Sequence, residues 1–437
     1  MKKKWRQLTA ALAAALTLSA CSFPAVGSAP AAESSISRDQ GPGALAKILS
    51  GLREGESSAS AEEPEEMRAV WIAYLDLAPL LRGKTEAEFS EGFSAMAENC
   101  RTAGFNTVIV QARPFGDSFY PSAYFPWSNL VGGALSYDPM EIMTAEAAEN
   151  GLSFHAWINP MRAMTEAEAA AVPQEFLLRQ WYDDPVFRTE HLILLDGRIY
   201  LNPASAEARK LIADGAAELA ANYAIDGVHI DDYFYPPSLD LSIDAASYES
   251  YCGAGGTLDQ ADWRRENTFQ MVRELSAAVK KANPSAQFGV SPRGKMSQNT
   301  DDLFIDLERW AKEPECLDYL APQLYYGFRN TAAPFADTAE EWNRLAEDSG
   351  VRLIIGLAAY KIGSLDSYAG EGASEWIEDP DLLANQIAES RKLSAYGGVM
   401  LFRYGSIFQP DAEHQSSMEK ALESFLPLFS EKADPAG

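Results

Sequence analysis

Eight short apolar runs alternate with segments of helical period, and this alternation restricts the possible folds more than any other feature of the chain. The runs are rich in β-branched and aromatic residues, as is typical of strands. They lie at residues 67–75, 105–113, 152–160, 227–236, 287–294, 319–328, 352–363 and 397–405. Strands that alternate with helices pair in parallel through right-handed crossovers. Eight such units predict an α/β fold, a closed (β/α)8 TIM barrel.

An open, doubly wound sheet is the alternative to the barrel. Such a sheet normally has a glycine-rich phosphate turn after its first strand, whereas the first run here continues into YLDLAPLL, without glycine. The barrel is therefore the preferred prediction. Between the runs, Pro139 and Pro380 are expected in first turns of helices, and Gly397 is expected to end one.

Two connections are longer than a simple crossover, and both follow the carboxyl end of a predicted strand. Residues 161–226 follow the third run and include Asp196-Gly197, which is typical of a two-residue hairpin turn. Residues 237–286 follow the fourth run and begin with a polar loop. Because a barrel builds its active site from loops at the carboxyl ends of its strands, these two extensions are expected to form walls of a cleft.

The first 20 residues are typical of a signal peptide. A basic start, MKKKWRQ, precedes an apolar stretch that is too short for a comfortable membrane span. The next residues, Leu18-Ser19-Ala20-Cys21, resemble the lipobox of bacterial lipoproteins. That resemblance implies that Cys21 is lipidated and that the protein is anchored to a cell membrane, outside the cytoplasm. An ordinary signal peptide with a chance cysteine is the alternative.

Composition divides the remaining chain and excludes one class of partner. Residues 21–66 are rich in Ala, Ser and Glu and predict a flexible tether, whereas residues 67–430 have the composition of a packed domain. The net charge of −27 argues against nucleic acid as a partner. Cys100, Cys252 and Cys316 have no paired spacing and are expected to be buried thiols. No metal ion or cofactor is expected.

Polar and aromatic side chains gather at the carboxyl ends of the eight runs. Aromatic faces mixed with planar hydrogen-bonding groups suit a sugar ring, which has apolar faces and hydroxyl edges. Each residue alone could be explained by packing or by an ion pair, but together they predict a carbohydrate cleft. The candidate substrate-binding residues are Arg113, Trp157, Asn159, Tyr235, Arg293, Gln323, Tyr325, Tyr360 and Lys361. His155 and His229 are expected to be hydrogen-bonded core residues, because no histidine cluster indicates a metal site.

Asp231 and Asp232 stand side by side where the fourth run, GVHIDDYFYP, loses its apolar pattern. Two carboxylates so close in an aromatic pocket cannot both ionise freely, so one should have a raised pKa. This predicts a proton donor beside a permanent anion, as glycoside cleavage requires. The structural alternative is that Asp232 caps the following segment while Asp231 pairs with an arginine such as Arg113.

Five blocks resemble, in order, the motifs of the bacterial glycosyl-hydrolase-like family ten. They are MRAVWIAYLDLAPLL, GFNTVIVQARPFGDSFYPSAYFPWSNLVGG, YDPMEIMTAEAAENGLSFHAWINPMRA, YLNPASAEARKLI and DGVHIDDYFYP. The resemblance covers about residues 67–410. It implies a (β/α)8 glycosidase-like domain on a secreted or lipid-anchored protein, and some relatives are associated with cleaving peptidoglycan glycan strands. Asp231 and Asp232 occupy the family's acidic motif.

The predicted function is hydrolysis of an N-acetylated cell-wall polysaccharide, peptidoglycan above all, by one of two mechanisms. In the first, Asp117, or else Asp76, is the partner of the Asp231–Asp232 pair across the cleft, at the roughly 5 to 9 Å usual for glycosidases. In the second, which we favour, the N-acetyl group of the substrate attacks the anomeric carbon. One aspartate then orients the acetamide and the other protonates the leaving oxygen.

Two other function classes compete with this prediction. A non-catalytic glycan-binding lipoprotein is supported by the lack of a glutamate at the ends of the runs. A metal-dependent hydrolase that uses the acidic pair is the third class.

Overall fold

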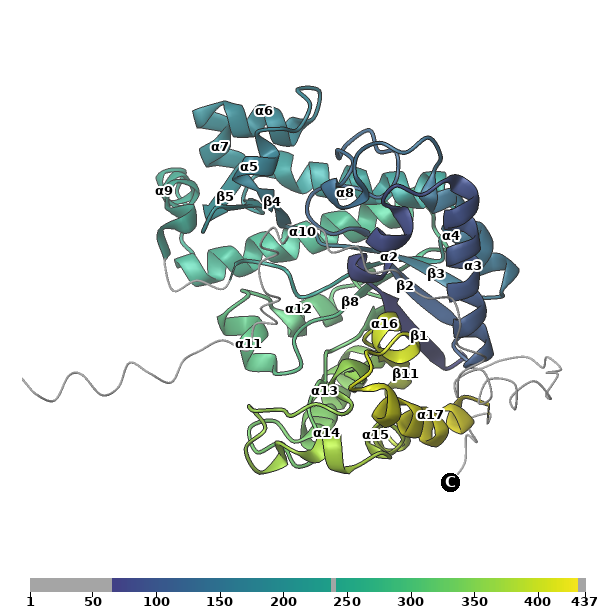
Figure 1. The fold of residues 1–437 in the computed structure, drawn as a ribbon. Coiled ribbons are helices and arrows are strands. Elements are labelled where there is room, and N and C mark those ends of the chain that lie inside the picture. Colours follow the sequence, from purple (N-terminus) through teal and green to yellow (C-terminus); the bar gives the residue numbers. More distant parts are fainter. Residues whose placement is uncertain (1–64, 237–240, 431–437) are drawn as a thin grey trace, which may run out of the picture. The chain divides into compact units, whose positions relative to one another are not determined.

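The eight predicted strands close into a parallel barrel (Figure 1). The computed structural model describes residues 65–236 and 241–430. The barrel strands are β1 (Met67–Ile72), β2 (Thr107–Arg113), β3 (Ser153–Ile158), β7 (Gly227–Ile230), β8 (Gln287–Val290), β9 (Tyr319–Leu320), β10 (Arg352–Leu357) and β11 (Tyr396–Leu401). Each strand pairs with the next in the chain, and β11 pairs with β1 to close the ring. The (β/α)8 prediction is confirmed.

Alternation along the strands separates the barrel interior from the layer between strands and helices. On β7, Val228 and Ile230 belong to the large core that the helices cover, whereas His229 lies between them on the inward side. A second, smaller apolar cluster fills the interior. It contains Met67, Ala69, Trp71, Ala73, Ile109, Trp157, Tyr319, Ala321, Ile354 and Met400.

Helices surround the barrel and follow local sequence signals. The longer ones are α2 (Tyr74–Leu81), α3 (Glu86–Thr102), α4 (Pro139–Glu149), α8 (Ala206–Asn222), α10 (Gln260–Ala282), α13 (Phe335–Ser349), α15 (Leu382–Ser390) and α17 (Gln415–Ser430). Helix α4 starts with Pro139 in its first turn, as predicted, because Asp138 caps it. The predictions for Pro380 and Gly397 were wrong. Helix α15 begins only after Asp381, and Gly397 is the second residue of β11.

The two long connections form a structure of their own beside the barrel (Figure 1). The first contains β4 (Arg162–Thr165), α5 (Glu166–Ala169), α6 (Leu177–Asp183), α7 (Pro185–His191), β5 (Leu192–Leu195) and β6 (Arg198–Leu201). Strands β5 and β6 form the predicted hairpin, with Asp196 at φ 50° and Gly197 at φ 74°. The second contains α9 (Ala245–Gly253), which has no buried residue, and this explains why Cys252 is exposed rather than buried as expected.

Two histidines, His155 of β3 and His229 of β7, lie in the barrel interior before the carboxyl ends of their strands. The indole N–H of Trp71 can only donate, so Nε2 of His229, 3.4 Å away, accepts. Nδ1 of His229 then donates to the Tyr319 hydroxyl, which in turn donates to Nδ1 of His155, each over 3.0 Å. Burial lowers the pKa of His155 to about 4 and the pKa of His229 well below its usual value. Both are neutral, hydrogen-bonded core residues at pH 7, as predicted.

The predicted signal peptide, Cys21 and nearly all of the predicted tether lie outside the described residues. Among the helices that are described, none has the length and apolar character needed to cross a bilayer.

Candidate active site

Asp231 lies just beyond β7, is buried, and accepts hydrogen bonds from three N–H groups. Its Oδ2 accepts from Nε1 of Trp157 at 3.0 Å and from Nδ2 of Asn159 at 2.9 Å. Its Oδ1 accepts from the backbone N–H of Tyr233 at 3.2 Å. Burial and the charge of neighbouring Asp232 raise the pKa of Asp231 to about 8, against the opposing effect of these donors. Asp231 is therefore largely protonated at neutral pH.

Asp232 is more accessible and has a different environment. Its Oδ2 accepts from Nε of Arg293 at 3.3 Å, and its Oδ1 accepts from Nε2 of Gln323 at 3.0 Å. The guanidinium of Arg293 stabilises a negative charge on Asp232. A carboxylic acid thus lies beside a carboxylate, which is the arrangement that acid–base chemistry needs.

The end of β7 explains how two adjacent residues both reach the rim of the barrel, which is the edge formed by the carboxyl ends of its strands. Asp231 continues the inward alternation of Gly227 and His229. Asp232 would face the helices if the strand continued, but the strand ends at Ile230. The chain leaves the pleat there, and Asp232 contacts residues that follow β8 and β9.

Four aromatic side chains form a connected group at this rim. The Phe402 ring lies 6.1 Å from Tyr325, 5.9 Å from Tyr360 and 6.5 Å from Trp157, measured between ring centroids. Tyr325 and Tyr360 pack edge to face at 5.7 Å. Because Trp157 also donates to Asp231, the group brings apolar ring faces next to the acidic pair, as a sugar-binding cleft requires.

Three residues at this rim were not among the predicted site residues. The guanidinium of Arg162 lies 4.3 Å from the ring centroid of Tyr233, and its charge acts to lower the pKa of Asp231. The buried hydroxyl of Ser291, beyond β8, has no hydrogen-bond partner among the described residues. Phe402 follows the last strand. Arg162 and Ser291 both stand near strand ends in the sequence, so their positions could have identified them, whereas Phe402 looks like one more strand residue.

Two predicted substrate-binding residues, Arg113 and Tyr235, lie in the layer between strands and helices. A bulge in β2 separates Gln111, paired with Trp157, from Arg113, paired with Ile158. The bulge turns Arg113 outward, where its guanidinium stacks over Phe125 at 4.0 Å. Tyr235 is buried against Phe304, with ring centroids 5.5 Å apart. Neither side chain lines the rim, and Arg113 is not the partner of Asp231.

Lys361 lies behind the aromatic group and already has two partners. Its ammonium donates to the carbonyl of Tyr325 at 2.8 Å and to the carboxylate of Asp366 at 2.7 Å. The geometry indicates that Lys361 holds the Tyr325 segment in place.

The two acids considered as partners of the pair are engaged elsewhere. Asp117 accepts from the backbone N–H of Phe115 at 2.8 Å, and burial raises the pKa of Asp117 to about 6. Within residues 65–236 and 241–430 it makes no hydrogen bond to Asp231 or Asp232. Asp76 caps the start of α2 and forms an ion pair with Arg403, and burial raises the pKa of Asp76.

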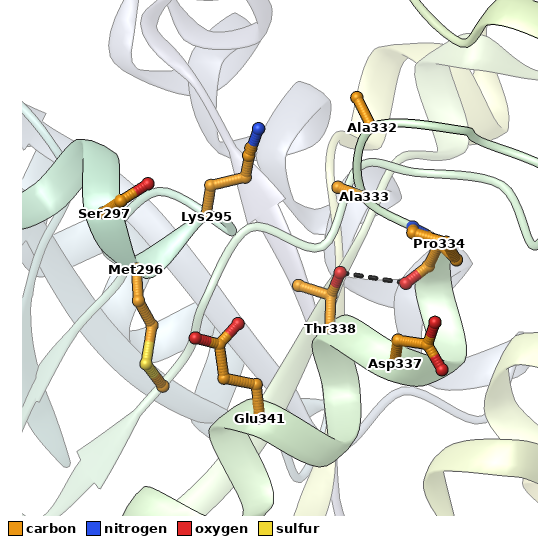
Figure 2. Close-up of a pocket in the computed structure, with 9 residues that line it drawn as sticks. All are labelled: Lys295, Met296, Ser297, Ala332, Ala333, Pro334, Asp337, Thr338 and Glu341. Carbon is orange, nitrogen blue, oxygen red and sulfur yellow. Dashed lines mark hydrogen bonds between the residues drawn. The ribbon is translucent and has the colours of Figure 1, made fainter.

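A hollow of about 260 Å³ is lined by residues that follow β8 and by α13 with the residues just before it (Figure 2). Residues 295–297 line one side, and the other side consists of residues 332–334 together with Asp337, Thr338 and Glu341. Neither aspartate of the pair belongs to this lining. We therefore place the candidate active site at the strand ends, not in the hollow.

One group of described residues, Glu190, His191 and Glu207, could offer three metal ligands, with their ligand atoms within 4.8 Å of one another. Nδ1 of His191 lies 2.7 Å from the Ser205 hydroxyl. The group is at the end of α7 and the start of α8, not at the acidic pair. At the pair itself, the positive charges of Arg162 and Arg293 disfavour binding of a metal ion.

Comparison with known proteins gives a family match and relatives that are named as glycosyl hydrolases. The sequence model of the family described as Glycosyl hydrolase-like 10 matches residues 66–371. The chain is 33% identical over 368 residues to Glycosyl hydrolase YngK of Bacillus subtilis (strain 168), and these residues are 79% of this chain and 69% of that protein. It is 28% identical over 392 residues to Glycosyl hydrolase DigH of Escherichia coli (strain K12), and these residues are 82% of this chain and 88% of that protein.

Solved structures with a similar barrel are more distant in sequence. The glycoside hydrolase domain of PgaB (BpsB) from Bordetella bronchiseptica matches with a TM-score of 0.55 and 14% identity, over 82% of this chain and 99% of that one. Alpha-L-fucosidase isoenzyme 2 from Paenibacillus thiaminolyticus matches with a TM-score of 0.51 and 13% identity, over 82% of this chain and 49% of that one. At these identities the similarity concerns the fold alone.

Proposed function

Because the chain belongs to the glycosyl hydrolase-like 10 family, we propose that it is a glycoside hydrolase of an N-acetylated cell-wall polysaccharide, with peptidoglycan glycan strands as substrate. The membership confirms the resemblance drawn from the sequence motifs. The observation that carries the proposal is the contrast within the acidic pair. Asp231 is buried with a raised pKa, and Asp232 is paired with Arg293.

The pair fits a substrate-assisted reaction. In the first step, Asp231 gives its proton to the glycosidic oxygen as the bond from that oxygen to the anomeric carbon breaks. The carbonyl oxygen of the substrate's own acetamide group bonds to the anomeric carbon. Asp232 accepts a hydrogen bond from the acetamide N–H and stabilises the positive charge that develops there. Water then attacks the anomeric carbon, returns a proton to Asp231 and releases the acetamide.

Two further features support this route over one that uses Asp117. The carboxylate of Asp117 is engaged by the backbone of its own loop, whereas Asp231 and Asp232 contact the predicted substrate-binding residues Trp157, Asn159, Arg293 and Gln323. The aromatic group around Phe402 offers ring faces for the apolar side of a sugar.

The substrate-assisted route predicts a strong dependence on the acetamide group. We expect the protein to release reducing ends from glycan strands freed of peptides, and to act at least about 10²-fold more slowly after chemical de-N-acetylation, because the internal nucleophile is lost. The measurement is reducing-end release from the two strand preparations, matched for length. Equal rates would contradict the route. Binding of both strands without any release would favour the non-catalytic glycan-binding alternative.

We further propose that Cys21 holds the domain at a membrane, outside the cytoplasm. The proposal rests on the lipobox-like Leu18-Ser19-Ala20-Cys21 and on the basic, apolar start of the chain. Cys21→Ser is expected to move the protein from the membrane fraction to the soluble fraction of cells. A processed Cys21→Ser protein that still sediments with membranes would argue against the anchor.

A further inference from the structure

Gln111, at the inner face of β2, is buried and has a defined orientation. A backbone N–H can only donate, so Oε1 of Gln111 accepts from the N–H of Tyr74 at 2.9 Å. This orientation leaves Nε2 of Gln111 to donate to Oδ1 of Asn159 at 2.8 Å. The orientation of the Gln111 amide is thus fixed by the backbone N–H of Tyr74, which cannot accept a hydrogen bond.

The orientation of Gln111 determines that of Asn159. Because Oδ1 of Asn159 already accepts from Gln111, it is Nδ2 of Asn159 that faces Oδ2 of Asp231 and donates to it at 2.9 Å. The indole N–H of Trp157, which also can only donate, points at the same oxygen at 3.0 Å. Oδ2 of Asp231 therefore receives two N–H groups and has no room for a proton of its own. The only other donor described at this carboxyl is the N–H of Tyr233, 3.2 Å from Oδ1.

We propose that Gln111 is a positioning residue of the acid. By fixing the amide of Asn159, it makes Oδ1 of Asp231 the oxygen that carries the proton and presents it to the leaving group. The inference rests on the proposed role of Asp231 as proton donor. Gln111 itself makes no hydrogen bond to Asp231, so it acts only through Asn159.

Other charged and titratable groups also face Asp231 and remain unchanged when Gln111 is replaced. Asp232 follows it in the chain, and Arg293, beyond β8, pairs with Asp232. Arg162 of β4 contributes a positive charge. His229, one inward position earlier on β7, is neutral. In a variant of Gln111 that adds no charge, a change in the titration of Asp231 therefore reports the amide relay, which is the hydrogen bond from Gln111 to Asn159 followed by the one from Asn159 to Asp231.

The test replaces the donating amide by a group of the same shape that cannot donate. In Gln111→Glu, the carboxylate accepts from Tyr74 and faces Oδ1 of Asn159, so the Asn159 amide must turn over. Oδ1 of Asn159 then meets Oδ2 of Asp231, which favours a proton on that wrong oxygen. We expect kcat to fall by about 10-fold or more, with KM within about three-fold, because an oriented acid contributes on the order of 10²- to 10⁴-fold. The alkaline limb of the pH profile should move upward, because Asp231 loses a donor to its anion and gains a negative neighbour.

Gln111→Met is the matched variant without charge, and it carries the test should the Glu variant fail to fold. It keeps the side-chain length but releases the Asn159 amide, so we expect a several-fold loss in kcat and a smaller upward shift of the alkaline limb. If Gln111 only fills space, the melting temperature will fall while the pH profile stays that of the wild type. An unchanged profile in a folded variant would overturn the proposal.

A direct titration separates this inference from the proposed function. The carboxyl ¹³C resonance that disappears in Asp231→Asn identifies Asp231 in protein labelled at aspartate. We expect its titration midpoint to rise in Gln111→Met, which adds no charge, and to rise further in Gln111→Glu, whether or not any substrate is turned over. A midpoint shifted in Gln111→Met together with an inactive wild type would refute the proposed function but leave the relay standing. An active wild type with an unshifted midpoint in Gln111→Met would refute the relay and leave the function standing.

Discussion

Asp231→Asn and Asp232→Asn should each lower kcat/KM on an N-acetylated glycan by about 10²- to 10⁴-fold, the range typical of a lost acid or base. Asparagine keeps the shape of each side chain and removes its titration. The barrel should remain folded, because the strand ends of a barrel are separable from its packed interior. The measurement is reducing-end release over a range of pH, with the folded state verified by circular dichroism.

The pH profiles of the two variants should differ, because the two aspartates have opposite protonation states. Asp231 must carry a proton, so the wild-type rate should fall as pH rises through its pKa of about 8. This fall belongs to the pair and not to Asp231 alone, because the charge of Asp232 helps to raise the pKa of Asp231. Asp231→Asn should lose the alkaline limb. Asp232→Asn should keep it but move it to lower pH, because the charge that helps to raise the pKa of Asp231 is gone. If Asp232→Asn loses the alkaline limb and Asp231→Asn keeps it, Asp232 is the proton donor and Asp231 is the residue that faces the acetamide.

Asp302→Asn is the matched control for these variants. Asp302 pairs with the same arginine as Asp232, with its carboxylate 3.3 Å from Nη1 of Arg293, but it is half exposed and is not part of the pair. Its replacement should leave kcat/KM within a few-fold of the wild type. If both variants of the pair do the same, the pair is structural, and the acids would have to be sought at Asp117 and Asp76.

The barrel could be predicted from the sequence because its strands are buried on both sides. A parallel strand covered by helices outside and side chains inside reads as a nearly continuous apolar run, and all eight runs contain a barrel strand. The end of such a run is also visible in the sequence. For this reason the sequence alone indicates four candidate site residues that contact one another in the structure, Asp231, Asp232, Trp157 and Asn159.

Side-chain direction could not be predicted in the same way. Arg113 looks like a strand-end residue, but the bulge after Gln111 reverses its direction, and nothing in VIVQAR marks that bulge. The sequence does not show that Lys361 has a partner. Its ion pair with Asp366 depends on the turn between these residues, which is defined only in the folded structure. The relay from Gln111 to Asn159 depends on the register of β2 and β3, which links residues 48 positions apart. These features arise from pairing between segments, and a single sequence does not display them.

Breaking the ion pair of Asp244 and Arg264 should destabilise the packing of α10 against the segment that follows β7. Both side chains are fully buried, and Arg264 of α10 donates to the two carboxylate oxygens of Asp244 at 2.6 and 2.8 Å. The guanidinium also lies 5.3 Å from the ring centroid of Tyr235, four residues after Asp231. Arg264→Met leaves a buried carboxylate without its cation, so we expect the free energy of unfolding to fall by about 3 to 5 kcal/mol. Urea unfolding followed by tryptophan fluorescence measures the change.

The same substitution at an exposed pair and a double variant define what the buried pair contributes. Arg344 pairs with Glu340 across one helical turn at the surface, so Arg344→Met should cost less than about 1 kcal/mol. Arg264→Met combined with Asp244→Leu removes both buried charges, and it should be more stable than Arg264→Met alone, because no unpaired carboxylate remains. If the double variant is instead the less stable of the two, the attraction within the pair outweighs the cost of burying its charges. If Arg264→Met unfolds at the wild-type urea concentration, the buried pair does not stabilise the fold, because the loss of its cation then costs no free energy of unfolding.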